Sequence, residues 1–159
     1  MAKVIMTCGK ICSGKSTYAR RLREERKGVI LSLDEIMLTL FPEGAGGMHD
    51  NYVLRTEQYL LNLSLQILAL GTDVILDWGL WTRVQRERLR GFYAEHGIDS
   101  EIHYLRIPQD EWERRIRKRN ARRDPEQPDA YTVDEDLLRK VEALFEEPAA
   151  EETDVIIEA

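Results

Sequence analysis

Eight residues near the start of the chain carry the clearest chemical pattern in the sequence. Residues 9–16 read Gly-Lys-Ile-Cys-Ser-Gly-Lys-Ser and follow the spacing G-x-x-x-x-G-K-[ST]. Glycines in such a loop let the backbone approach a polyanion closely, and successive N–H groups converge on phosphate oxygens. The pattern predicts a loop that binds ATP. The expected cofactor-binding residues of this segment are Gly9, Lys10, Ile11, Cys12, Ser13, Gly14, Lys15, Ser16 and Thr17.

Three side chains at the end of this loop have more specific expected roles. Lys15 is expected to reach the β- and γ-phosphates as a positive charge and to act in catalysis. The hydroxyl of Ser16 is placed to bind Mg²⁺, so ATP and Mg²⁺ are the expected cofactors. Thr17 is expected either to hydrogen-bond near the α-phosphate or to pack in the first turn of the next helix.

Asp34 follows the second apolar run of the chain, residues 29–33. Open α/β sheets bind their ligands beyond the carboxyl ends of their strands, so an acid here is expected near the nucleotide. Such an acid can accept the proton of an attacking hydroxyl, which is the general-base role in phosphoryl transfer. The alternative is that Asp34 caps the following helix, and the two roles are compatible.

Asp77 ends the third apolar run, residues 73–77. An acid at this position is expected to hold the water shell of Mg²⁺ or to orient the acceptor substrate. Asp77 could instead share the base role with Asp34, or be a plain turn residue before Trp78 and Gly79. The sequence leaves these alternatives open.

A strongly basic segment lies in the second half of an otherwise acidic chain. Arg115, Arg119 and Arg122 share one helical face by their i, i+4, i+7 spacing, so they are expected to close over the triphosphate and neutralise its charge. A solvated face is the expectation for Arg114 and Lys118. A nucleic-acid-binding strip is less favoured, because no aromatic residues are interleaved with the basic ones.

Apolar runs that alternate with amphipathic stretches determine the expected fold. Parallel strands need helical crossovers, so this alternation predicts a three-layer α/β fold around a parallel sheet. A glycine-rich stretch, residues 41–50, is expected to be a mobile loop. Strands are expected at residues 3–7, 29–33, 73–77, 102–107 and 154–158, and helices at residues 16–27, 51–70, 82–96, 108–123 and 132–145.

The composition is that of one globular domain spanning residues 1–159. Hydrophobic residues make up 43% of the chain and charged residues 33%, and the formal net charge is −6. An acidic protein is a poor general nucleic-acid binder. No apolar run approaches the ~20 residues that span a bilayer, and no signal peptide is expected. The only cysteines, Cys8 and Cys12, are expected to be reduced thiols of a cytoplasmic protein.

With these residues placed, the chain resembles the small P-loop kinases of the AAA-type ATP-binding kinase family. This group includes chloramphenicol phosphotransferase, gluconate kinase, polynucleotide kinase and zeta-toxin-type kinases, and more distantly adenylate kinase. The resemblance covers nearly all of the chain in the order of its elements, with the phosphate-binding loop as its most specific motif. It implies a nucleoside-monophosphate-kinase-like fold of five parallel strands in the order 2-3-1-4-5, with an arginine-bearing lid.

The resemblance also implies roles for individual residues. Asp34 matches the base that activates the acceptor hydroxyl, and Arg115 matches the arginine that lies against adenine. Arg119 matches the arginine that contacts the transferred phosphate, and Arg122 or Arg123 is expected to add a further lid contact. The lid is expected to be short, within residues 112–131. Substrate contacts are expected from Thr82, Arg83 and Arg86, together with Asp34 and Asp77.

The expected activity is therefore an ATP-dependent transfer of phosphate to the hydroxyl of a small molecule, such as an antibiotic, a sugar or a nucleoside-like compound. One alternative is a polynucleotide 5′-hydroxyl kinase, which needs a basic groove toward Asp34. The residues of the acceptor region, Glu43, His49, Asp50 and Asn51, do not supply one. Another alternative is a nucleotide-binding switch or ATPase without an acceptor. The sequence predicts neither the identity of the acceptor nor the oligomeric state.

Overall fold

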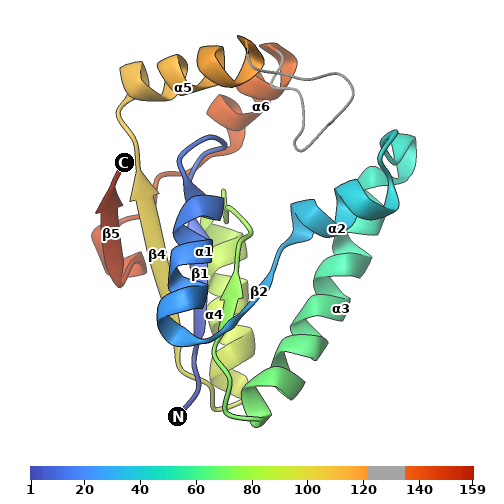
Figure 1. Cartoon of the computed structure of the whole chain (residues 1–159), viewed down its shortest axis with the longest axis vertical. Helices are drawn as coiled ribbons and strands as arrows, with labels where there is room; N and C mark the ends of the chain where they lie inside the picture. The colour runs from blue at the N-terminus through green and yellow to red at the C-terminus, as the bar shows by residue number, and fades with distance from the viewer. Residues whose placement is uncertain (122–134) are drawn as a thin grey trace.

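The computed structural model describes residues 1–121 and 135–159, and its centre is a five-stranded parallel sheet (Figure 1). The strand order is β2-β3-β1-β4-β5, with every neighbouring pair parallel, so the predicted order is confirmed. The strands are β1 (Val4–Cys8), β2 (Val29–Leu31), β3 (Val74–Leu76), β4 (Ser100–Arg106) and β5 (Val155–Glu158).

Helices cover both faces of the sheet, and a further pair lies beyond the carboxyl ends of its strands (Figure 1). The predicted three-layer architecture is therefore confirmed. No helix of the described residues is both long and apolar enough to cross a membrane. The α-helices are α1 (Lys15–Arg26), α2 (Leu33–Leu40), α3 (His49–Ala69), α4 (Arg83–Glu95), α5 (Gln109–Ala121) and α6 (Glu135–Leu144), and the short 3₁₀ helices are Gly46–Met48 and Ala150–Glu152.

The central strand β1 is apolar on both faces because both are covered by helices. Val4 and Met6 pack in a core shared with α3 and α4, whereas Ile5 packs toward α1, and all three are fully buried. A third, smaller core around Trp112 joins α5 to α6. These packing arrangements hold the end of β1, and therefore the loop after it, in a fixed place.

Several boundaries differ by one or two residues from the sequence predictions, and two of the differences lie near the predicted site. β2 ends at Leu31 instead of residue 33, because Ser32 caps α2 by accepting a 3.2 Å hydrogen bond from the backbone N–H of Glu35. Asp34 is therefore not the cap and lies in the first turn of α2. The glycine-rich stretch is also partly helical, since α3 already begins at His49.

Other boundaries agree with their predicted signals. The helix α3 ends just before Gly71, whose φ of 82° suits glycine at the end of a helix. The predicted capping box at the start of α4 is present, with reciprocal hydrogen bonds between Thr82 and Gln85. The cap predicted at residues 132–134 and the lid segment 122–131 lie outside the described residues.

Candidate active site

The predicted phosphate-binding loop joins β1 to α1, and its glycines are required by the local geometry. A Cβ at Gly9 would lie 2.8 Å from Ser13 Oγ and 3.0 Å from the Leu105 carbonyl oxygen. Gly14, at the start of α1, has a φ of 94°, which L-residues with a side chain rarely adopt. The loop therefore leads directly into the N-terminus of a helix, where backbone N–H groups and the helix dipole favour an anion.

Ser13 Oγ is buried in this loop. In the part of the chain that the structure describes, it is the one buried side-chain oxygen or nitrogen without a hydrogen-bond partner. A polar group in this state costs free energy unless something satisfies it. The loop thus offers a bound phosphate an unsatisfied hydroxyl in addition to its N–H groups, which fits the predicted nucleotide.

Lys15 folds back over the same loop. Its Nζ donates hydrogen bonds to the carbonyl oxygens of Gly9 at 3.0 Å and Lys10 at 2.7 Å. Burial lowers the pKa of this amine, and the carboxylates of Asp77 and Asp34 act in the opposite direction. The two acids predicted at the strand ends are therefore close enough to Lys15 to influence its charge.

Ser16 and Asp77 meet across the loop. Ser16 Oγ donates to Asp77 Oδ2 at 2.9 Å, and Thr7 Oγ1 donates to Asp77 Oδ1 at 3.2 Å. Hydroxyl and carboxylate oxygens are the ligands that Mg²⁺ prefers, usually alongside waters and substrate phosphates. The pair therefore fits the predicted Mg²⁺ site, and Thr7 is a supporting residue that the sequence pattern did not indicate.

Asp34 lies in the first turn of α2, where the residue is exposed at the surface. Desolvation of its carboxyl raises its pKa, Lys15 lowers it and Asp77 raises it; the smaller influences of Arg119 and His49 also lower it. No hydrogen bond to this carboxyl comes from the described part of the chain. The fold thus gathers the predicted base, the loop lysine and the predicted metal-binding acid around one space.

His49 joins this group although no sequence motif contains it. It is half-buried at the first residue of α3, fifteen positions after Asp34 along the chain. Its effect on the pKa of Asp34 arises because α2 and α3 fold back on each other. Only the tertiary fold could reveal this proximity.

The basic helix α5 presents two of its arginines to the phosphate-binding loop. Arg119 Nη1 donates to Cys12 Sγ at 3.1 Å, and Arg115 Nη1 lies 3.7 Å from the position of a Cβ on Gly14. Both arginines are half-buried, whereas Arg114 is exposed, as expected for a solvated face. The third predicted arginine of this face, Arg122, lies outside the described residues.

Trp112 holds α5 against the same loop. Its ring is 1% exposed, and its Nε1 donates to the Ile11 carbonyl oxygen at 2.8 Å. No sequence pattern indicates a role for this residue, since an isolated tryptophan in a basic helix matches no functional motif. Its contact explains how the arginines one and two turns later reach the loop.

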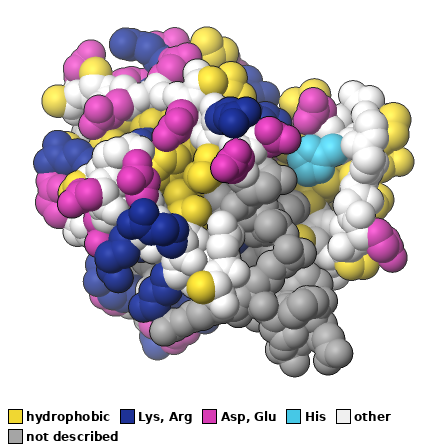
Figure 2. All heavy atoms as spheres, turned by 90° about the horizontal axis from the view of Figure 1, so that it is seen from above, with side chains coloured by type: hydrophobic (Ala, Val, Ile, Leu, Met, Phe, Trp, Pro, Cys, Tyr) yellow, Lys and Arg dark blue, Asp and Glu magenta, His cyan; other side chains and the backbone are white. Residues whose placement is uncertain are grey.

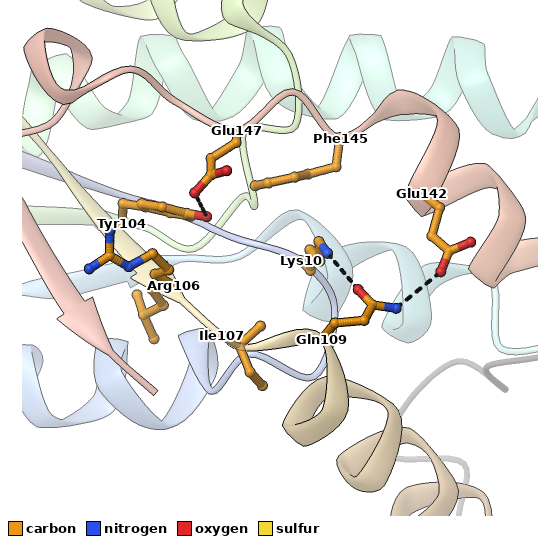
Figure 3. A pocket seen from close by; sticks show the side chains of 9 residues that line it. Lys10, Tyr104, Arg106, Ile107, Gln109, Glu142, Phe145 and Glu147 are labelled. Atoms are coloured by element: carbon orange, nitrogen blue, oxygen red, sulfur yellow. Dashed lines mark hydrogen bonds between the residues drawn. The ribbon is translucent and has the colours of Figure 1, made fainter.

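A pocket of about 500 Å³ adjoins the loop at Lys10, between the end of β4 and α6 (Figure 3). The Lys10 ammonium lies 4.4 Å from the centre of the Trp112 ring and 3.5 Å from Gln109 Oε1. Asp34, Asp77 and Lys15 do not line this pocket. The Lys10 side chain therefore points away from the predicted catalytic groups, and its expected contact with phosphate is limited to its backbone.

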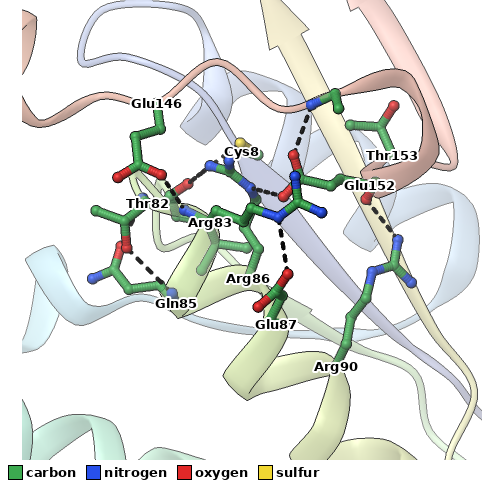
Figure 4. Close-up of polar contacts among 12 residues, drawn as sticks. Cys8, Thr82, Arg83, Gln85, Arg86, Glu87, Arg90, Glu146, Glu152 and Thr153 are labelled. Carbon is green, nitrogen blue, oxygen red and sulfur yellow. Dashed lines mark hydrogen bonds and ion pairs between the residues drawn. The ribbon is translucent and has the colours of Figure 1, made fainter.

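Two arginines expected to hold substrate are engaged by other groups of the protein (Figure 4). Arg86 is 1% exposed, and its guanidinium donates to Glu152 and to the Leu80 carbonyl oxygen. Arg83 is exposed and pairs with Glu87 on the surface of α4. The prediction took both from a resemblance, which gives position along the chain but not the direction of a side chain.

Comparison with known proteins places the chain among nucleotide-binding proteins. The family described as "AAA domain" matches residues 4–148. No curated protein sequence matches.

Solved structures with the same fold include two kinases and a protein in complex with ADP-AlF3. The Mycobacterium tuberculosis APS kinase CysC in complex with AMPPNP and APS is 19% identical, with a TM-score of 0.68 over 99% of this chain and 88% of that one. Chaetomium thermophilum Kti12 in complex with ADP-AlF3 is 16% identical, with a TM-score of 0.74 over 98% and 88%. A gluconokinase from Sinorhizobium meliloti 1021 is 18% identical, with a TM-score of 0.64 over 98% and 82%. At such identities the likeness extends to the fold.

Proposed function

Because the chain belongs to the AAA domain family and has the fold of the small P-loop kinases, we propose that it is an ATP-dependent phosphotransferase. In this proposal it moves the γ-phosphate of ATP to a hydroxyl group of a small molecule. The observation that carries the proposal is the gathering of Asp34, Asp77 and Lys15 at the phosphate-binding loop. Asp34, whose carboxyl accepts no hydrogen bond from the described part of the chain, is available to accept the proton of an attacking hydroxyl.

The donor side of the reaction uses the loop and its two flanking cations. The backbone N–H groups of residues 9–16 bind phosphate oxygens, and Lys15 leaves the loop carbonyls to contact the β- and γ-phosphates. Mg²⁺, when bound by Ser16 and Asp77, supplies charge neutralisation at the phosphates. The contact of Arg119 with Cys12 keeps its guanidinium at the loop, beside the phosphate that is transferred.

The acceptor side uses Asp34 as the general base. Both oxygens of Asp77 are already engaged by Ser16 and Thr7, so Asp77 is the poorer proton acceptor of the two acids. The acceptor hydroxyl gives its proton to the Asp34 carboxylate, and its oxygen forms a bond to the γ-phosphorus. The bond between the γ-phosphorus and the bridging oxygen breaks, which releases ADP. The raised pKa of Asp34 makes its ionised form a stronger base.

Charge distribution supports a small acceptor over a polynucleotide. On the described face above the sheet, basic side chains are interspersed with acidic ones instead of forming a continuous basic surface (Figure 2). Several arginines there are already paired with acids, such as Arg114 with Glu111 and Arg139 with Glu135. A groove for a nucleic-acid backbone would need unpaired cations along its length.

The second candidate function is an ATPase or nucleotide-binding switch without a small acceptor. The specific observation in its favour is the similarity to Kti12, whose printed complex contains ADP-AlF3. The two candidates differ in one measurable respect, which is whether phosphate is transferred to a compound other than water.

The test is a screen of hydroxyl compounds with γ-labelled ATP, in which labelled product is separated from labelled phosphate. The phosphotransferase proposal expects label in an acceptor with the wild-type protein and at least about a hundredfold less with Asp34→Asn. ATP hydrolysis that is independent of every compound offered and unchanged by Asp34→Asn would favour the second candidate.

A further inference from the structure

Arg86 is a charged residue deep inside the protein and is among its largest fully buried side chains. It belongs to α4, whose N-terminus follows the segment after β3. Its Nε donates to Glu152 Oε1 at 3.0 Å, in an ion pair whose two side chains are 1% and 9% exposed. A buried pair of this kind stabilises the fold little compared with an apolar pair of equal volume. Stability alone therefore does not explain why it is there.

The second contact of Arg86 indicates a reason. Its Nη1 donates to the Leu80 carbonyl oxygen at 2.9 Å, and Cys8 Sγ donates to the same oxygen at 3.5 Å (Figure 4). Leu80 has a φ of 50° and follows Gly79 with a φ of 78°, so two successive residues are in the left-handed region. A leucine keeps this conformation only where its surroundings hold it. Arg86 is the charged donor that holds it.

The segment that ends at Leu80 is also the segment that contacts the phosphate-binding loop. At its start, Asp77 accepts the hydrogen bond from Ser16. Two residues later, the Gly79 carbonyl oxygen accepts a 2.9 Å hydrogen bond from the N–H of Gly9, the first residue of the loop. Leu80 therefore lies only one residue after Gly79 and three residues after Asp77, the two residues that contact the loop.

The C-terminal part of the chain completes the support for this segment. The N–H of Glu146 donates to the Trp81 carbonyl oxygen at 2.7 Å, and Glu152 holds the guanidinium of Arg86 from the opposite side. The carboxyl of Glu152 stays ionised for this contact: desolvation opposes its ionisation, but the hydrogen bond from Arg86 and a backbone N–H lower its pKa overall.

We propose that Arg86 is a positioning residue that holds residues 77–80 so that Asp77 meets Ser16 at the Mg²⁺ site and Gly79 stays bonded to Gly9. This role rests on the proposed function, because it assigns Arg86 to the geometry of the Mg²⁺–nucleotide site. It replaces the direct substrate contact that the sequence resemblance implied for this residue.

The decisive variant is the double replacement R86M/E152L, which removes both charges and keeps an apolar filling of similar size. No uncompensated buried charge remains, so the fold is expected to survive. The matched control is R88M/E57L, which removes another ion pair between α4 and the rest of the protein. Among the described residues, Arg88 makes no hydrogen bond or ion pair with residues 77–80.

The measurement is the binding of a fluorescent ATP analogue with and without Mg²⁺, which needs no acceptor and no catalysis. Removing groups that orient metal ligands typically lowers metal affinity 10-fold to 100-fold, and we expect a loss in about that range for the Mg²⁺-dependent part of the affinity in R86M/E152L. Its Mg²⁺-free affinity and circular dichroism spectrum are expected to match the wild type. R88M/E57L is expected to match the wild type in its Mg²⁺-dependent affinity, its Mg²⁺-free affinity and its circular dichroism spectrum.

Each outcome decides between the alternatives. A folded R86M/E152L with wild-type Mg²⁺ dependence overturns the positioning role, and so does an equal loss in R88M/E57L. If R86M/E152L does not fold, R86K replaces it. Lysine keeps the charge but lacks the two-sided geometry of guanidinium, so we expect R86K to lose Mg²⁺ dependence to a smaller extent. An R86K protein with unchanged Mg²⁺ dependence would overturn the positioning role. A wild-type protein without Mg²⁺-dependent nucleotide binding would overturn the proposed function as well.

Discussion

The hydroxyl of Ser16 donates a 2.9 Å hydrogen bond to Asp77 Oδ2 and so joins the first turn of α1 to the end of β3. These residues are 61 positions apart in the chain, yet they form the pair of oxygen donors expected for Mg²⁺. The sheet sets the distance between Ser16 and Asp77, because β1, which leads into α1, and β3, which ends before Asp77, are neighbours with a fixed register.

The first prediction concerns this pair. Ser16→Ala removes one oxygen donor, and we expect the Mg²⁺ concentration for half-maximal nucleotide binding to rise about tenfold to a hundredfold. Ser16→Thr restores a hydroxyl and is expected to restore the Mg²⁺ dependence. The measurement is a Mg²⁺ titration with a fluorescent nucleotide, and an unchanged midpoint for Ser16→Ala would exclude this residue as a metal ligand.

The second prediction concerns Lys15. Lys15→Ala removes the positive charge at the loop, so ATP binding is expected to weaken and the turnover number to fall about a hundredfold to a thousandfold. Lys140→Ala, on the exposed side of α6, is the control for general loss of positive charge. Full activity of Lys15→Ala in a γ-labelled ATP assay would contradict the assignment of the loop.

The third prediction concerns Asp34. Asp34→Asn removes the proposed proton acceptor, and we expect phosphate transfer to fall about a hundredfold to ten-thousandfold while the affinity for ATP stays nearly the same. Glu35→Gln is the matched control, because Glu35 is an exposed neighbour in the same helical turn. Equal transfer rates for the two variants would show that Asp34 is not the base.

The fourth prediction follows from the raised pKa of Asp34, which desolvation causes and Lys15 partly offsets. Because the folded state holds this proton more tightly than the unfolded chain, wild-type stability falls as pH rises through the folded-state pKa. Asp34→Asn avoids this cost and is expected to unfold at a higher temperature than the wild type at about pH 7, with no gain at about pH 3.

The size of this gain is limited by solvent. Asp34 is exposed as a residue, so screening keeps the difference in the free energy of unfolding below about 1 kcal/mol. Thermal unfolding of both proteins over this pH range measures it. The same gain at both ends of the range would show that ionisation of Asp34 is not its source.

The fifth prediction concerns Arg119. Arg119→Met removes the guanidinium that we propose to contact the transferred phosphate, and we expect the turnover number to fall about a thousandfold with a much smaller change in ATP affinity. Arg114→Met is the control on the same helix, because Arg114 is exposed and pairs with Glu111. A similar loss in both variants would point to the overall charge of α5 instead of one arginine.

Local patterns in the sequence were sufficient to predict much of the fold and of the candidate site. The spacing of residues 9–16 requires glycine at Gly9 and Gly14 for reasons that act within a few residues, so the loop could be recognised without a fold. The i, i+4 spacing of Arg115 and Arg119 put them on one helical face, and both do face the loop. The strand order followed from the resemblance and is confirmed.

The remaining features depend on contacts between distant parts of the chain, which no local pattern encodes. Arg86 seemed a substrate residue by position, yet the packing of α4 against the C-terminal segment buries it against Leu80 and Glu152. His49 influences the pKa of Asp34 only because α2 and α3 fold back on each other. The sequence by itself determined the phosphate-binding loop that we propose, since that depends on backbone geometry over eight residues. Tertiary structure decided which charged side chains face that loop and which are enclosed, because burial depends on what packs against them.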